Sequence, residues 1–154
     1  MPDINMEHAM ALPAGGVKLF KVFARMEYAL KREDYFTNHN NRLSVDWQRF
    51  ANERLGNGFL TRVRNEKLAP TILAHPPRRQ SGAGGTFEFT EMPPPNTIQD
   101  FVFAVCRVRH NLFHGGKSHN SMSLRNRKLV KEANVILIEM LQECPTIRAH
   151  FENP

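Results

Sequence analysis

Apolar residues recur at helical spacing in the first third of the chain. Between residues 17 and 35 they stand at mostly helical intervals: Val17, Phe20, Phe23 (or Ala24), Tyr28 and Leu30. The breaker pair Gly15-Gly16 precedes this stretch, which therefore predicts a helix over residues 17–35. A second helix is predicted from Ser44, a residue that caps helix N-termini well, to the stop at Gly56.

Residues 59–68 predict a short third helix, whose continuation Pro70 disfavours. The stretch 70–95 then changes character, because it is rich in prolines and glycines that oppose regular structure. We interpret it as one long loop. The alternation of polar and apolar residues over 86–90 leaves a small strand or hairpin edge open as an alternative.

Two further helices are predicted in the last third of the chain. The first begins near Asn96 or Thr97, where Asn96 and Gln99 resemble a capping box, and runs toward His114. Its buried side is predicted to contain Phe101, Val102, Val105, Cys106 and Val108. The second is capped by Ser123 and ends at Cys144-Pro145. The pattern as a whole predicts an all-α, up-and-down bundle of four to five helices, with one domain over residues 1–154 and a core over about 17–144.

The charge distribution favours a polyanionic partner. The formal net charge is +6, and no carboxylate lies between Asp100 and Glu132. That interval holds seven cations: Arg107, Arg109, Lys117, Arg125, Arg127, Lys128 and Lys131. A solvated basic surface is the alternative interpretation. Two cysteines form no disulfide framework, and no apolar run reaches membrane-span length, so we expect a cytoplasmic protein with no membrane contact.

The segment 109–117 gathers the side chains with the greatest chemical capacity. Arg109, His110, Asn111 and His114 fall within six residues, and Gly115-Gly116 follow. An imidazole can remove a proton from a ribose 2′-hydroxyl, and a guanidinium can bind two phosphate oxygens. Asn111 could orient the histidine or a substrate oxygen. The acidic ligands that magnesium prefers are absent around the segment, so no metal or cofactor is expected.

Helix geometry limits how these side chains cooperate. Arg109 and His114 stand five positions apart, roughly 140° around a regular helix, so they share a face only if the last turn unwinds. In a symmetric dimer, Arg109 of one subunit could instead meet His114 of the other. The negative end of the helix dipole also means that an anion site here needs side-chain cations, for which Arg107 and Lys117 are candidates. A histidine that merely caps the helix is the alternative reading of His114.

Arg109, four intervening residues and His114, late in an apolar helix, resemble the signature of the HEPN superfamily. His110 takes the place of the polar residue that commonly follows the arginine there. The run 111–117 resembles stand-alone HEPN-like proteins of bacterial plasmids and defence systems, and the first predicted helix around Met26-Glu27-Tyr28 is similar too. The resemblance covers roughly residues 17–144.

The resemblance implies a metal-independent endoribonuclease that acts as a homodimer with a composite cleft. Arg109 and His114 would be the catalytic pair, with His110 as the supporting polar position between them. From the chemistry of the residues themselves, Asn111 is a further supporting candidate, and Arg107 and Lys117 are candidates for binding substrate. Such proteins act as toxins or phage-defence effectors on cellular RNA, with an antitoxin or defence-system partner. Other members are inactive, so the alternative is a dimeric module that binds nucleic acid, a nucleotide or a partner protein. Glu27 either pairs with Lys31 at the surface or points at the cleft.

Overall fold

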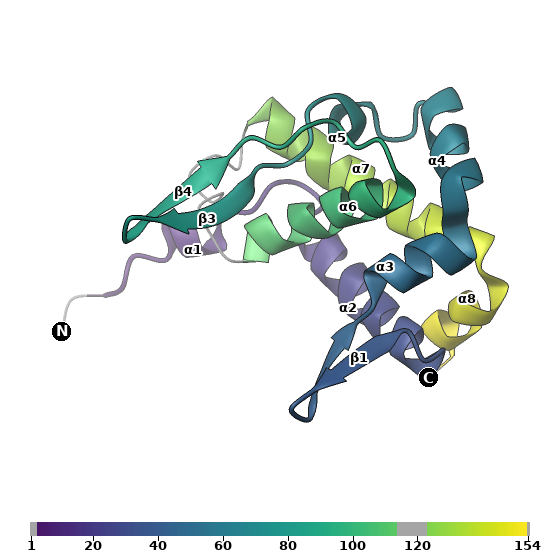
Figure 1. Cartoon of the computed structure of the whole chain (residues 1–154). Coiled ribbons are helices and arrows are strands. Elements are labelled where there is room, and N and C mark those ends of the chain that lie inside the picture. The colour runs from purple at the N-terminus through teal and green to yellow at the C-terminus, as the bar shows by residue number, and fades with distance from the viewer. Residues whose placement is uncertain (1–2, 114–122, 154) are drawn as a thin grey trace.

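The computed structural model describes residues 3–113 and 123–153, and long helices form its centre (Figure 1). These are α2 (Gly16–Arg32), α6 (Ile98–Phe113) and α7 (Leu124–Glu143). Helix α6 packs against α2 and α7, and also against shorter helices on its other sides: α3 (Trp47–Phe50), α4 (Gly56–Asn65) and α5 (Pro70–Ala74). Helix α6 is therefore the central element of the molecule.

The apolar spacing of the long helices explains their burial. On α6 the side chains of Phe101, Val102, Val105 and Val108 are buried, as the sequence predicts, and Cys106 is half-buried. Burial raises the pKa of the Cys106 thiol, so this cysteine behaves as an apolar side chain. Together with the apolar faces of α2 and α7 these residues form a continuous core.

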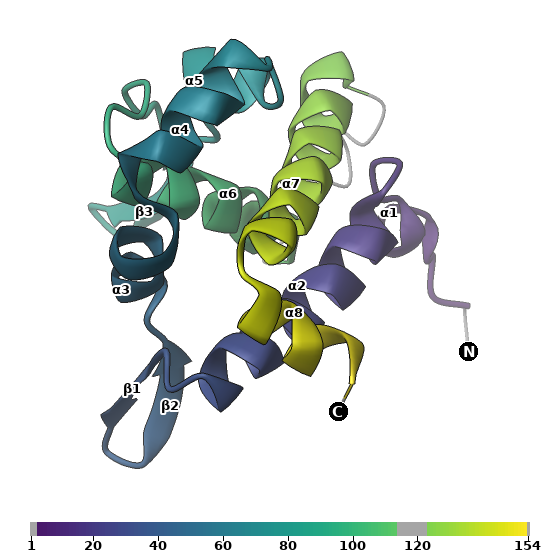
Figure 2. The same ribbon diagram turned by 90° about the vertical axis from the view of Figure 1, so that its right-hand side faces the viewer.

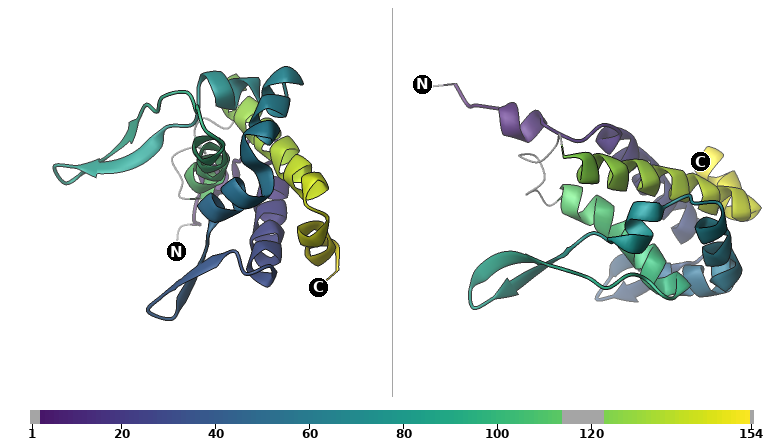
Figure 3. Two further views of the ribbon diagram at one scale, coloured as in Figure 1. Left: turned by 45° about the vertical axis from the view of Figure 1, so that its right-hand side comes forward. Right: turned by 90° about the horizontal axis from the view of Figure 1, so that it is seen from above.

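Two β-hairpins show that the prediction of an all-α bundle was wrong. β1 (Phe36–His39) pairs antiparallel with β2 (Arg42–Val45), and β3 (Arg79–Ala83) pairs antiparallel with β4 (Thr86–Thr90). Both hairpins project from the helices (Figure 3). The molecule is thus a mixed structure of helices and two small antiparallel sheets.

The turns explain the two hairpins. Each is closed by a two-residue turn in which both residues have positive φ, the geometry that matches the twist of paired strands. Asn40 and Asn41 have φ angles of 49° and 60°, and Gly84 and Gly85 have 57° and 79°. Within the expected loop of residues 70–95, α5 and the β3–β4 hairpin replace most of the irregular structure, and the alternative of a strand over residues 86–90 was correct.

The second predicted helix begins later than expected and is interrupted. Asp46, not Ser44, is its N-cap, because the Asp46 side chain accepts a hydrogen bond from the Arg49 amide at 3.1 Å. Ser44 lies in β2 instead. After α3 the chain passes through a π-helical turn, η1 (Ala51–Leu55), and Gly56, with a φ of 70°, leads into α4. The third predicted helix therefore starts at Gly56.

The ends of α6 and α7 follow side-chain capping. Thr97 Oγ1 accepts the Asp100 amide at 3.1 Å, so Thr97, not Asn96, caps α6. Gln99 donates to Asn52 Oδ1 at 2.6 Å, so it takes no part in a capping box. Ser123 caps α7 as predicted, accepting the Asn126 amide at 3.4 Å.

Helices α1 and α8 lie outside the predicted set. Helix α1 (Glu7–Met10) is exposed near the N-terminus, and α8 (Pro145–Glu152) follows α7 and packs beside α2 (Figure 2). The Arg25 guanidinium ties α2 to α8 by donating to the carbonyls of His150 and Phe151. Among the described residues no helix combines the length and apolarity that a membrane span needs.

Glu132 of α7 holds the start of α5. Its side chain is buried, and Oε1 accepts the amides of Thr71 at 2.6 Å and Ile72 at 3.3 Å. Those amides have no partner within a helix that begins at Pro70. A carboxylate at this place also opposes the positive end of the helix dipole. Glu132 therefore joins two elements that are 60 residues apart in the chain.

We expect Glu132→Ala to lower the free energy of unfolding by about 2 to 3 kcal/mol, because two buried amides lose a charged acceptor. Urea unfolding followed by circular dichroism measures the change. The matched control is Glu88→Ala on the exposed face of β4, expected to change stability by less than about 0.5 kcal/mol. Equal effects of the two variants would contradict the capping role.

Candidate active site at the end of helix α6

The described part of the predicted motif lies in the last turn of α6. Arg109, His110 and Asn111 belong to this turn, and the described part of the helix ends at Phe113. His114 and Lys117, together with the two glycines between them, lie outside the described residues. The pairing of Arg109 with His114 therefore stays a prediction.

Arg109 lies against α2 and is held by aromatic rings. Its guanidinium carbon is 5.2 Å from the ring centroid of Phe23 on α2 and 4.9 Å from that of Phe113, one turn further along α6. Phe113 in turn meets Phe20 of α2 edge-on, with 6.0 Å between ring centroids. The side chain is half-buried, and within residues 3–113 and 123–153 its guanidinium has no hydrogen bond or ion pair. The motif arginine is thus positioned by stacking, with its N–H donors uncommitted in this part of the chain.

Glu27 of α2 supplies the negative charge near this arginine. It stands one turn after Phe23 and is partly buried. Burial raises the pKa of the Glu27 carboxyl, and the positive charges of Arg109 and Lys31 offset part of that effect. Among the described residues no ion pair joins Glu27 to Lys31, and Arg109 has the larger effect of the two cations on the pKa of Glu27. A direct role of Glu27 at the cleft stays a prediction.

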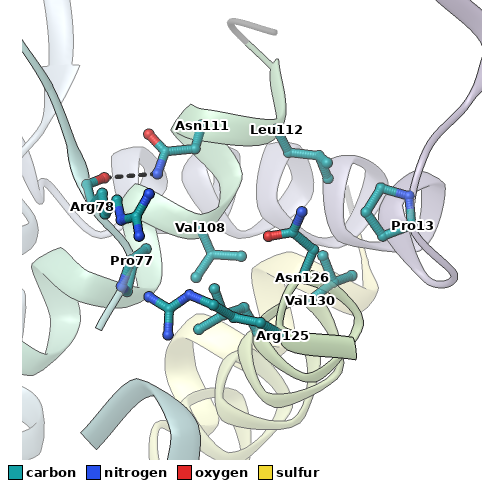
Figure 4. Close-up of a pocket in the computed structure, with 10 residues that line it drawn as sticks. Pro13, Pro77, Arg78, Val108, Asn111, Leu112, Arg125, Asn126 and Val130 are labelled. Atoms are coloured by element: carbon teal, nitrogen blue, oxygen red, sulfur yellow. Dashed lines mark hydrogen bonds between the residues drawn. The ribbon is translucent and has the colours of Figure 1, made fainter. Parts of the chain in front are cut away.

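Arg107 and Asn111 face away from Arg109, toward the segment that leads into β3. Three successive carbonyls of that segment accept hydrogen bonds from helix side chains. Arg125 Nη2 donates to Pro76 O at 2.9 Å and Arg107 Nε to Pro77 O at 3.0 Å. Asn111 Nδ2 donates to Arg78 O at 2.8 Å (Figure 4). Since prolines have no amide to donate, this segment cannot join a regular ladder through those residues, and side chains satisfy its carbonyls instead.

The hydrogen bonds to Pro77 and Arg78 give Arg107 and Asn111 a structural role. Burial lowers the pKa of the Arg107 guanidinium, which remains a cation at neutral pH. Asn111 is only 2% exposed and lines a cavity of about 20 Å³, room for roughly one water molecule. A cavity of this size does not hold a nucleotide. Contacts of these residues with substrate, and of Asn111 with the histidine, stay predictions.

His110 lies on the hairpin side of α6. It is exposed and lines a surface hollow together with residues of β3, β4 and their turn, among them Gln80 and Phe87. Because consecutive residues of a helix point about 100° apart, Arg109 faces α2 while His110 faces the hairpin. Arg107, His110 and Asn111 thus share the side of α6 toward β3, as their spacing predicts, and the structure does not bring His110 to Arg109.

Residue spacing indicates one of the neighbours of Arg109 but not the others. Phe113 is four residues after Arg109, a spacing that places the two side chains together on a helix. Phe23 and Glu27 come from a helix more than 80 residues earlier, and no local pattern links them to Arg109. Among the described residues no cluster of His, Cys, Asp and Glu side chains could hold a metal ion.

Comparisons with protein-family models, with curated proteins and with solved structures give no match. The resemblance to the HEPN superfamily therefore rests on the motif residues and their place in the sequence.

We expect the stability of the protein to depend on the charge of Glu27. The raised pKa means that the folded state binds this proton more readily than the unfolded state, whose carboxyl keeps its ordinary value of 4.5. The contribution of protonated Glu27 to stability is therefore complete below pH 4.5. It is lost as pH rises through the pKa that Glu27 has in the folded state. The stability advantage of Glu27→Gln over the wild type should thus grow as pH rises above 4.5, measured by urea unfolding across pH.

In an Arg109→Gln background, where the opposing charge is absent, the gain from Glu27→Gln should be larger. If Glu27→Gln instead becomes less stable than the wild type as pH rises, attraction between Glu27 and Arg109 outweighs the cost of burying the Glu27 charge.

We expect Asn111→Ala to destabilise the protein by about 1 to 2 kcal/mol, because the carbonyl of Arg78 loses its donor. Amide hydrogen exchange should show faster exchange in β3 and β4 than in α2. Lys21→Ala, at an exposed position of α2, is the control and should leave both stability and exchange nearly unchanged. Unchanged exchange in Asn111→Ala would contradict its role in holding the segment.

Proposed function

We propose that this protein is a metal-independent endoribonuclease, with Arg109 and His114 as its catalytic pair. The observation that carries the proposal is the state of Arg109, a cation fixed by the rings of Phe23 and Phe113 at the end of the central helix. The neighbouring arginines differ, because Arg107 and Arg125 donate to backbone carbonyls. Arg109 is the motif arginine whose donors are uncommitted among the described residues, and it stands five positions before a histidine.

The chemistry needs a base and an anion-binding group. His114, as a neutral imidazole, removes the proton of a ribose 2′-hydroxyl, and the 2′-oxygen attacks the adjacent phosphorus. The bond from phosphorus to the 5′-oxygen breaks, the 5′-oxygen takes up a proton from solvent, and a 2′,3′-cyclic phosphate remains. The guanidinium of Arg109 binds the phosphate oxygens on which charge increases. Glu27 acts as a positioning residue, holding the guanidinium by charge.

The proposed enzyme is a homodimer, in which two α6 ends meet. The negative end of one helix dipole repels phosphate, and a second copy doubles the number of cations present. Arg107 and Lys117 would then contact substrate phosphates, with His110 and Asn111 in support. The proposed role in a cell is that of a toxin or phage-defence effector acting on RNA, controlled by an antitoxin or defence-system partner.

The decisive measurement is cleavage of RNA by the purified protein in EDTA. We expect products with a 2′,3′-cyclic phosphate, and no cleavage of a 2′-O-methylated RNA. His114→Ala should abolish the activity, and Arg109→Ala should lower it by at least about 100-fold. Arg109→Lys should not restore it fully, because lysine lacks the planar fork. Arg148→Ala, an exposed arginine of α8, is the control and should retain activity.

Circular dichroism of each variant separates loss of activity from loss of fold, which matters because Arg109 also packs on two rings. Cleavage that persists in His114→Ala would overturn the assigned pair. Salt-sensitive RNA binding without turnover, weakened by Arg109→Ala, would instead establish the inactive binding module.

A further inference from the structure

A second group of cations lies on another side of the molecule, along the first half of α7. Arg127, Lys128 and Lys131 are exposed there and line two adjoining surface hollows. Lys18 of α2 completes one hollow, and Lys67, between α4 and α5, completes the other. Lys131 lines both, so the hollows adjoin at this residue. We call these five cations the basic face of α7.

The carboxylates nearest to this face are engaged elsewhere. Glu132 lines one hollow, but its side chain is buried and accepts the amides of Thr71 and Ile72. Glu139 lines the other and pairs with Arg62 at 2.9 Å. Ion pairs that would neutralise the five cations are absent among the described residues. The face therefore carries a positive field toward solvent.

These charges do not serve the helix that carries them. The first turn of α7 contains no acidic residue, and cations at a helix N-terminus oppose its dipole. Arg127 and Lys131 are four residues apart, and Lys128 and Lys131 three, so like charges also repel along one face. Places where a sequence breaks local electrostatic rules without a structural gain are expected to be functional. A bound phosphate reverses the sign of both effects.

Asn134 gives this face a further polar group. Its side chain is only 7% exposed and lines the hollow that contains Lys18, Arg127 and Lys131. Nδ2 donates to the carbonyl of Gly15 at 3.1 Å, and Oδ1 has no hydrogen-bond partner among the described residues. Because Oδ1 is buried, it lies beneath the surface of the hollow, and the cations are the groups that the hollow offers to a ligand.

We propose that the basic face of α7 binds the sugar–phosphate backbone of RNA away from the bond that is cleaved. The inference rests on the proposed ribonuclease function and identifies where a long substrate is held. The phosphates of such a backbone match the row of cations. An anionic membrane is a poorer fit, because none of the exposed large apolar side chains of the described chain lines either hollow.

The test uses the triple variant Arg127→Gln, Lys128→Gln and Lys131→Gln in the full chain. Its matched control is Lys21→Gln, Arg32→Gln and Arg42→Gln, which removes the same net charge from exposed positions elsewhere. The probe is a single-stranded 2′-O-methylated RNA, which binds but cannot be cleaved. We expect the α7 triple to weaken binding and to lower the slope of log K against log salt by roughly two, at about 0.7 per lost contact. The control should change the slope far less.

Stability gives an independent readout. Because the three charges are unfavourable for α7, the triple variant should unfold at the same or a higher urea concentration than the wild type. A clear loss of stability would assign the cations to the fold and overturn the proposal. Equal weakening of RNA binding by the two triple variants would also overturn the proposal. The same holds if the α7 cations are needed for binding to phosphatidylserine vesicles but not for binding to RNA.

Cleavage of a dinucleotide, whose one phosphodiester is the bond that is cleaved, distinguishes the two proposals. It should be the same in the α7 triple as in the wild type. If the wild type cleaves nothing, the ribonuclease proposal fails while the binding experiment still decides whether the face holds RNA. If dinucleotide cleavage remains and binding is unchanged in the triple variant, the basic face fails and the catalytic pair stands.

Discussion

The burial of α6 sets the conditions for every polar side chain that this helix carries. Helices surround it on several sides, and the segment leading to β3 covers another. A polar group in such a place must find a partner inside the protein. Arg107 and Asn111 find backbone carbonyls, whereas Arg109 finds aromatic rings. The difference between a structural arginine and a candidate catalytic arginine follows from which neighbour each one meets.

The long helices could be predicted because their apolar residues repeat at one spacing that burial then exploits. The hairpins could not be predicted from the same criterion. The pair Asn40-Asn41 and the pair Gly84-Gly85 indicate tight turns, but glycine and asparagine also mark irregular loops. A hairpin turn is distinguished from an irregular loop only by the backbone of the folded chain, in which both turn residues have positive φ. The prediction of a helix start at Ser44 was wrong because Asp46, two residues later, is an equally good N-cap, and local sequence does not distinguish between them.

The candidate site could be located in the sequence but not assembled from it. The spacing of Arg109 and His114, and their place at the end of an apolar helix, are local features. The Phe23 ring and the Glu27 carboxylate near Arg109 come from α2, and the carbonyls that occupy Arg107 and Asn111 come from the approach to β3. Such contacts depend on how helices pack, and the sequence around residue 109 contains no trace of them. The same holds for the basic face of α7, whose hollows require α2 and the start of α5.

Because Arg109 stacks on Phe23 and Phe113, its side chain loses much of its conformational entropy during folding and not during ligand binding. A free arginine side chain samples many rotamers and gives up roughly 2 kcal/mol of this freedom when a ligand immobilises it. Here much of that loss occurs during folding, when the two rings close around the guanidinium. Binding a phosphate then requires little further ordering. The aromatic pair thus transfers an entropic penalty from the encounter with a ligand to the folding of the protein.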